Sequence, residues 1–257
     1  MSAPVHIRST TLATTFGVAT LNVSFGSLPA VGNQIIARVF GSTNGAAATS
    51  VTLSDNQGGS NTYAQSVFVN NATGNRYCAI AASTIPLVTS SGTFTLTITI
   101  NGGSGNNTIE LAGSEYGTMA TGNPLNVTIS NTGASTVTLD TTAAASTSQA
   151  DEVFFSVCAT NSGSASTAPF TNNAAGSVPS SGWTNDFSDG DDTNLCAGVM
   201  SSVIVSSIQA PRDVITANAA GPFSAVLASF KGATTAETPT TITGLGRRMI
   251  SVGYWQG

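Results

Sequence analysis

The chain has 257 residues, of which 40% are hydrophobic and 7% are charged, and its net charge at pH 7 is −5. An average soluble domain carries about 25% charged residues, so this chain has to build its polar surface from Ser, Thr, Asn and Gly. Its seven basic residues include one lysine, Lys231, which disfavours nucleic acids and anionic membrane surfaces as partners.

The first 21 residues have no basic region followed by an apolar core, so we expect no secretory signal peptide. No stretch has the apolar length of a transmembrane helix. We expect residues 1–18 to form an N-terminal arm, residues 19–232 a β-sandwich domain and residues 233–257 a C-terminal arm. His6, the only histidine, then lies in the arm.

Alternation of apolar and polar residues recurs along the chain and is typical of antiparallel strands with one buried face. In "FTLTITI", Phe94, Leu96, Ile98 and Ile100 face one way and three threonines the other. Similar runs occupy 19–25, 34–40, 63–69, 125–129, 153–159, 200–207, 223–231 and 249–254. Clusters of Gly, Asn, Ser and Pro separate them, which predicts an all-β protein, an antiparallel β-sandwich of jelly-roll-like form.

The stretch "SDNQGGSNTY" lies between two such runs. A calcium loop needs several oxygen ligands at fixed offsets and a later glutamate, but Asp55 is the only carboxylate here. We therefore predict a hairpin turn, in which Asp55 and Asn56 bond nearby backbone and Gly58 and Gly59 adopt positive φ.

The three cysteines offer no clear disulfide framework. Cys78 and Cys158 lie within strand-like runs, where cysteine usually acts as a small hydrophobic residue. We expect Cys78, Cys158 and Cys196 to be reduced thiols of a protein made in a cytoplasm, with a Cys158–Cys196 bridge as the alternative.

No residue pattern supports catalysis. A hydrolase triad needs a histidine, and a cysteine nucleophile needs a base; His6 is the only candidate for either role. Glu110 and Glu115 are an odd number of positions apart, so on a regular strand they face opposite sides of the sheet and form no dyad. We expect neither an enzyme nor a bound cofactor.

The longest interruption of the strand pattern runs from Thr160 to Asn194, and loops of this length are usually functional or contact a partner. We predict that Phe170, Trp183 and Phe187 anchor it on a neighbouring subunit; packing on their own sandwich is the alternative. The same segment contains Asp186, Asp189, Asp191 and Asp192, which we interpret as a solvated loop, with calcium ligation as the alternative.

After Gly232 a Thr-rich linker leads to "RRMISVGYWQG". This has the form of an arm that ends in an apolar, aromatic anchor. We predict that Tyr254 and Trp255 contact a neighbouring subunit.

The segment "VTLSDNQGGSNTY" resembles the "VTDSxGNTY" hairpin of a family of β-sandwich modules found in bacteriophage structural proteins and large bacterial surface proteins. "VGNQIIARVF", "FTLTITI", "IELAGSEYGTMATGNPLNVT" and "GPFSAVLASFKG" resemble further segments of that family in the same order. The resemblance extends over about Gly32 to Gly232 and consists of strands and turns. Asn33 replaces the family's aspartate, and Phe223 stands where tryptophan is common. The resemblance implies a jelly-roll-like fold.

These observations favour a virion structural protein that self-assembles symmetrically, as a bacteriophage capsid decoration, turret or tail-associated subunit made in the host cytoplasm. Hydroxyl and amide groups cost less to desolvate than charges when subunits pack. Its expected partners are copies of itself and other virion proteins. The alternative is a carbohydrate-binding or adhesive module on a cell or virion, with Trp183 or Trp255 as a glycan platform.

Overall fold

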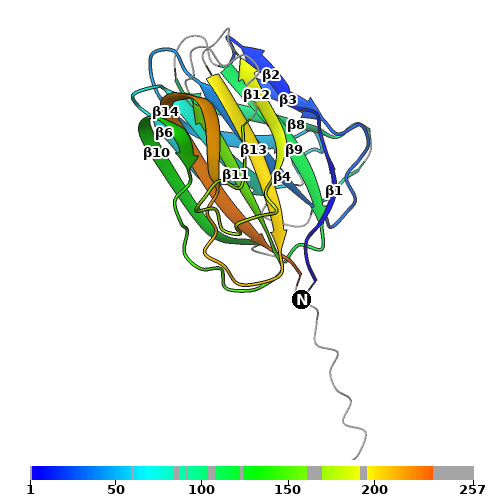
Figure 1. Ribbon diagram of the computed structural model, residues 1–257. Helices are drawn as coiled ribbons and strands as arrows, with labels where there is room; N and C mark the ends of the chain where they lie inside the picture. The colour runs from blue at the N-terminus through cyan, green and yellow to red at the C-terminus, as the bar shows by residue number, and fades with distance from the viewer. Residues whose placement is uncertain are drawn as a thin grey trace, which may run out of the picture.

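The computed structural model describes residues 2–59, 61–83, 87–90, 92–103, 108–121, 124–160, 170–191 and 196–233. These residues form fourteen strands and no helix, so the predicted all-β fold is confirmed. The strands make three antiparallel sheets, and Figure 1 shows the molecule as a β-sandwich in which the sheets lie in layers.

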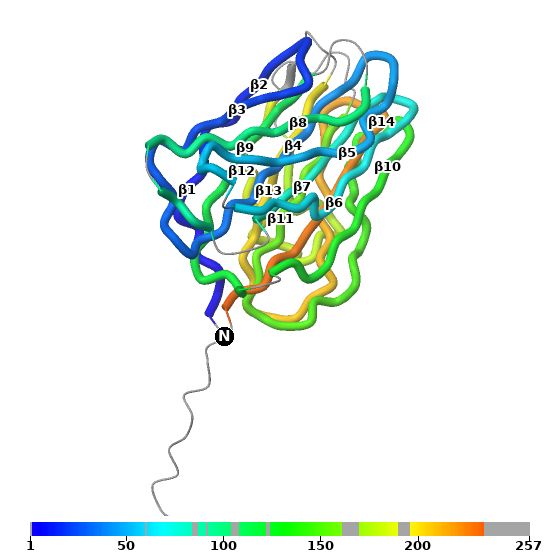
Figure 2. Tube along the Cα trace, turned by 180° about the vertical axis from the view of Figure 1, so that it is seen from behind, coloured from blue at the N-terminus to red at the C-terminus, as the bar shows by residue number. Residues whose placement is uncertain are grey.

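The central sheet has the strand order β1 (Val5–Ser9), β9 (Thr108–Gly117), β4 (Gln34–Ser42), β7 (Arg76–Ser83) and β6 (Tyr63–Asn71). A further strand, β2 (Ala13–Phe16), also pairs with β9. What we call the β8 sheet contains β3 (Thr20–Ser24), β8 (Thr95–Gly102) and β5 (Ala48–Asp55). It packs against one face of the central sheet and lies toward the viewer in Figure 2.

What we call the β11 sheet covers the other face and lies toward the viewer in Figure 1. Its order is β10 (Leu125–Asp140), β14 (Val214–Lys231), β11 (Glu152–Thr160), β13 (Cys196–Val205) and β12 (Thr184–Asp191). The long partner strands β10 and β14 pair along most of their length, with three irregularities in register.

The central sheet separates two hydrophobic cores. On β4, Ile35 and Val39 enter the core shared with the β8 sheet, whereas Ile36 and Phe40 enter the core shared with the β11 sheet. A strand buried on both faces is apolar on both sides, which explains the nearly continuous run "QIIARVF". The β11 sheet approaches closely at Gly198, where an added Cβ would lie 2.4 Å from the Phe40 ring.

The outer face of the β8 sheet shows the predicted alternation. Leu96, Ile98 and Ile100 are buried beneath it. Outside, Thr95, Thr97 and Thr99 are half-buried and lie beside hydroxyl and amide residues of both neighbouring strands. These neighbours are Thr20, Asn22 and Ser24 on β3 and Thr52 and Ser54 on β5.

Two expectations about the fold are wrong, the N-terminal arm and the hairpin at Asp55. Residues 5–16 are not an arm outside the sandwich, because β1 and β2 both pair with β9. The turn at Asp55 does not close a hairpin, because β5 pairs with β8 and β6 pairs with β7 in a different sheet. Pairing with strands distant in the sequence therefore decides where both segments lie. The proposed arm 233–257 lies outside the described residues after Ala233.

The excursion between β11 and β13 also differs from the expected loop. Its described part, 170–191, ends in the edge strand β12. The portion before β12 lies along the outer face of the β11 sheet, where Thr171 bridges to Thr216 and Val178 to Arg212. Much of this excursion is therefore a cover for its own sheet.

Candidate binding groove

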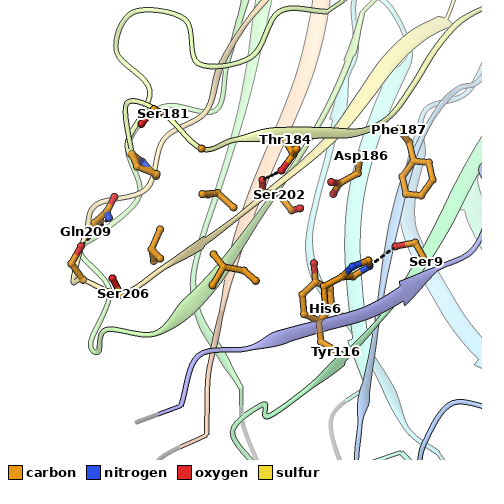
Figure 3. Close-up of a pocket in the computed structure, with 16 residues that line it drawn as sticks. His6, Ser9, Tyr116, Ser181, Thr184, Asp186, Phe187, Ser202, Ser206 and Gln209 are labelled. Atoms are coloured by element: carbon orange, nitrogen blue, oxygen red, sulfur yellow. Dashed lines mark hydrogen bonds between the residues drawn. The ribbon is translucent and has the colours of Figure 1, made fainter.

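A groove of about 700 Å³ lies where an edge of the central sheet meets an edge of the β11 sheet (Figure 3). His6 and Ser9 of β1 and Tyr116 of β9 line one side. Residues of β12, β13 and the segments flanking these two strands line the other side, and they include Thr184, Asp186, Phe187, Ser202, Ile204 and Gln209. The groove is therefore built by segments from both ends of the described chain.

Arg38 supports this groove from within the sandwich. It lies on β4 and is only 1% exposed, yet its guanidinium forms an ion pair with Asp186. A second nitrogen, Nη2, donates to Ser114 Oγ at 3.0 Å. The guanidinium carbon lies 5.2 Å from the Phe155 ring centroid and 5.5 Å from that of Phe187, so the cation is stacked between two aromatic rings.

A chain of polar contacts connects Arg38 to the rim. Ser114 Oγ lies 2.8 Å from Ser9 Oγ, and Ser9 Oγ lies 3.0 Å from His6 Nε2. The His6 ring packs on Tyr116, with 5.2 Å between ring centroids, and Figure 3 shows both at the same side of the groove. These contacts hold β1 in place and present the His6 imidazole and the Ser9 hydroxyl at the groove.

Burial raises the pKa of Tyr116 to about 12, because the phenolate form would lose its hydration. Asp186 raises this pKa further, whereas Arg38 and a hydrogen bond with Ser202 lower it. Tyr116 is consequently a neutral hydrogen-bonding group at physiological pH and not a general base.

The groove does not present the relay of a serine hydrolase. His6 and Ser9 are in contact, but Asp186 is the only carboxylate that lines the groove, and Arg38 engages it. A triad needs a carboxylate that orients the histidine. The residues that line the groove offer hydrogen-bonding groups and apolar surface.

The acidic residues that we interpreted as a solvated loop lie mostly on a strand. Asp186, Asp189 and Asp191 belong to β12, which pairs with β13. The predicted loop is therefore wrong at these three positions, because strand pairing determines their backbone, and Asp186 is in addition paired with Arg38. Asp192 lies outside the described residues. Within the part of the chain that the structure describes, no three His, Cys, Asp or Glu residues form a metal-binding group.

The residues expected at an interface have different positions. Phe170 and Trp183 are 7% and 4% exposed, and both pack on the outer face of their own β11 sheet. Trp183 lies 6.4 Å from Phe154 between ring centroids, and its backbone exchanges two hydrogen bonds with the Asn173 side chain. The prediction that these two side chains anchor on a neighbour is corrected accordingly, since their own sheet takes up their apolar surface.

Phe187 is half-buried in the groove wall beside Arg38. Tyr254 and Trp255 lie outside the described residues, so their predicted contact with another subunit stays a prediction.

The predicted turn role of Asp55 is confirmed, although the turn joins two sheets. For Asn56 the prediction is wrong, because its side chain bonds the backbone of Thr93 and Thr95, distant in the sequence. The Gln57 backbone N–H donates to Asp55 Oδ1 at 2.8 Å, and Asn61 and Tyr63 donate to Oδ2 at 2.7 and 2.5 Å. Gly58 and Gly59 have φ of 77° and 78°. The Asp55 carboxylate thus accepts the hydrogen bonds that stabilise this turn.

The carboxylates of β9 point to opposite faces, as their spacing predicted. Glu115 accepts hydrogen bonds from Arg8, Asn33 and the Ala30 backbone on the side of the β8 sheet. Glu110 is equally buried but lies on the other face of the strand. All three cysteines are buried thiols without a disulfide, and burial raises the pKa of Cys78 and Cys158. Cys158 and Cys196 belong to hydrophobic clusters on opposite faces of the β11 sheet, which disfavours the alternative bridge, and the redox state stays a prediction.

Sequence reasoning missed the groove. The sequence pattern predicts an arm around His6 and indicates no site role for Arg38 or Tyr116. A signal was present for Arg38, because a single arginine within an apolar strand has to find a counter-charge when both faces are buried.

Comparison of the chain with protein-family models, with curated proteins and with solved structures finds no match. No helix in the described ranges is long and apolar enough to cross a membrane.

Proposed function

We propose that this protein is a structural subunit of a virion that assembles with copies of itself. The observation that carries the proposal is the position of its charges. Among the Asp, Glu, Lys and Arg residues whose burial the structure describes, none is fully exposed, and in the ion pairs the most exposed side chain is Arg212 at 36%. Arg38, Arg76, Glu110, Glu115, Glu152 and Asp213 are buried, and the others are half-buried.

A surface with so little charge is poorly suited to a freely dispersed monomer. Net and local charge normally keep proteins apart in solution. Hydroxyl and amide groups, in contrast, lose less hydration free energy than ions when another surface covers them. A surface of this kind supports repeated contacts between subunits.

The outer face of the β8 sheet is the best candidate for such a contact. Its exposed and half-buried residues are threonine, serine and asparagine, arranged in cross-strand rows such as Thr20, Thr99 and Thr52. Successive rows on one face of a sheet are about 6.6 Å apart, and neighbouring strands about 4.8 Å apart. The result is a regular, uncharged surface.

The proposed virion setting draws on the resemblance of Gly32–Gly232 to modules of bacteriophage structural proteins, which itself implies a fold. Within a virion we propose a capsid decoration, turret or tail-associated component. The alternative of a glycan-binding module has weaker support. A sugar platform needs an accessible aromatic face, whereas Trp183 is 4% exposed; Trp255 lies outside the described residues, so a platform there stays a prediction.

The test is the oligomeric state of the full-length chain, measured by light scattering and negative-stain microscopy. We expect discrete symmetric oligomers. Thr97→Lys places a charge in the middle of the β8-sheet face and should shift the population towards monomers. Thr138→Lys, on exposed β10, is the matched control and should assemble normally. Wild-type chains that stay monomeric at every soluble concentration would overturn the proposal.

A further inference from the structure

The groove is bordered by two edge strands. β1 is the outermost strand of the central sheet and β12 that of the β11 sheet, and in the described part of the chain each pairs with one neighbour. An edge strand presents unpaired backbone N–H and C=O groups, to which an extended segment can add as a further strand. Figure 3 shows β1 on one side of the groove and β12 on the other.

Apolar side chains accompany these edges. Ile204 lines the groove and is 46% exposed. Ile204 is on the same face of β13 as Met200. Met200 is fully buried against the central sheet, whereas Ile204 lies past the edge of the central sheet and is not covered by it. Val5 and Ile7 on β1 are 48% and 50% exposed. Natural edge strands usually carry charges or proline against pairing, and β1 contains one charged residue, half-buried Arg8.

The end of the described chain lies beside β1. The Ala233 backbone N–H donates to Thr118 O at 2.7 Å, and the Ser2 N–H donates to Ala233 O at 2.9 Å. Both figures accordingly show the end of β14 beside the N-terminus. Residues 234–257 follow this point and include "RRMISVGYWQG".

The residues of that tail complement the residues of the groove. Met249, Ile250 and Val252 are followed by two aromatic residues, Tyr254 and Trp255, which supply apolar surface for Ile204. Two of the seven basic residues, Arg247 and Arg248, precede them, whereas Glu237 is the only acidic residue of the tail. The tail is therefore net positive, and the remainder of the chain is more negative than the whole. Such opposite charges favour association.

We propose that the groove between β1 and β12 binds residues 249–255 of a second copy of this chain, which add as a strand to one of the two edges. Residues 234–248 separate this segment from Ala233 and reach about 50 Å when extended. A tail that folded back into the groove of its own subunit would need only a short connection after Ala233. The longer connection that is present suits the groove of a neighbouring subunit. The inference rests on the proposed self-assembly and identifies one of its contacts.

Mixed disulfide formation between two full-length chains tests this contact. One chain carries Ile204→Cys and the other Trp255→Cys, with different tags, and the native cysteines are buried. Under mild oxidation we expect a disulfide-linked dimer that contains both tags. Val137→Cys, 41% exposed on the opposite edge strand β10, is the control for position 204 and should give little such product with Trp255→Cys.

Strand addition has its own readout, because proline cannot donate a backbone hydrogen bond. Adjacent residues of a strand direct their N–H groups to opposite edges, so either Ser251→Pro or Val252→Pro should abolish the cross-link, while Val252→Thr should retain it. Retention by both proline variants would overturn strand addition.

Other outcomes distinguish the inference from the proposed function. Equal cross-linking at position 137 overturns binding of a second copy's tail. The same holds if a chain that carries both Ile204→Cys and Trp255→Cys forms only an internal disulfide while the mixed single variants form none. Absence of any cross-link in chains that still form symmetric oligomers overturns this inference and leaves self-assembly intact. Absence of both cross-link and oligomers overturns both.

Discussion

Arg38 and Asp186, which are 148 positions apart in the sequence, form an ion pair between the middle of the central sheet and the edge strand of the β11 sheet. The Arg38 side chain is 1% exposed and that of Asp186 is 22% exposed. A charge buried to this degree is stable only when a counter-charge and hydrogen bonds replace its hydration. The pair therefore holds β12, and one wall of the groove, against the sandwich.

Removal of the carboxylate should destabilise the fold. Asp186→Asn leaves the Arg38 cation buried without its counter-charge, and we expect a loss of about 3 kcal/mol in the free energy of unfolding, measured by urea denaturation. The more exposed pair Arg212–Asp140 is the matched control, and Asp140→Asn should cost about 1 kcal/mol or less. Equal losses in both variants would contradict the role given to Arg38.

Stability should fall as pH rises through the acidic range because of Asp213. Burial raises the pKa of its carboxyl to about 7, Asp140 raises it further, and the hydrogen bond from Ser156 opposes them. Unfolded chains lose this proton near pH 4. Between about pH 4 and 7 the native state thus binds more protons than the unfolded state, and stability decreases with pH.

The change attributable to Asp213 over that range is at most about 4 kcal/mol, at 1.36 kcal/mol for each pKa unit. Urea unfolding at several pH values should show this slope in the wild type and a flatter slope in Asp213→Asn. Identical slopes in the two proteins would show that Asp213 does not titrate as its burial implies.

Trp183→Ala should lower the stability of the single subunit. The indole is 4% exposed and packs on Phe154 within the β11 sheet's outer core, so truncation leaves a cavity that costs about 3 to 5 kcal/mol. Thermal unfolding checks the loss, with Ile208→Ala at a 60% exposed position as the control. A normal unfolding midpoint together with weakened assembly would instead restore the interface role.

Calcium should leave the unfolding midpoint unchanged relative to EDTA. A ligand that binds only the native state raises stability by mass action. The Asp186 carboxylate forms an ion pair with Arg38. The Asp55 carboxylate already accepts hydrogen bonds from Gln57, Asn61 and Tyr63. Scanning calorimetry with and without calcium checks this expectation, and a clear rise with calcium would place a cation among the aspartates.

Local sequence predicted many of the strands and the Asp55 turn, although β1, β2 and β12 lie where an arm and a loop were expected. The alternation in "FTLTITI" predicted that Leu96, Ile98 and Ile100 are buried while the threonines face outward, and the structure agrees. Likewise Asp55 and two glycines predicted a turn with positive φ, which Gly58 and Gly59 adopt. These features depend on side chains within a few positions of one another, so the local pattern contains the necessary information.

Only the tertiary structure decided which strands pair and which surfaces meet. The run at 51–69 reads as a hairpin, yet its two strands lie in different sheets because β5 finds its partner in β8 and β6 in β7. Trp183 is a residue type that often anchors interfaces, but it is buried on the outer face of its own β11 sheet. The groove at Arg38 and Asp186 depends on contacts across more than half of the chain. Such contacts follow from the packing of whole sheets, which periodicity within a strand does not specify.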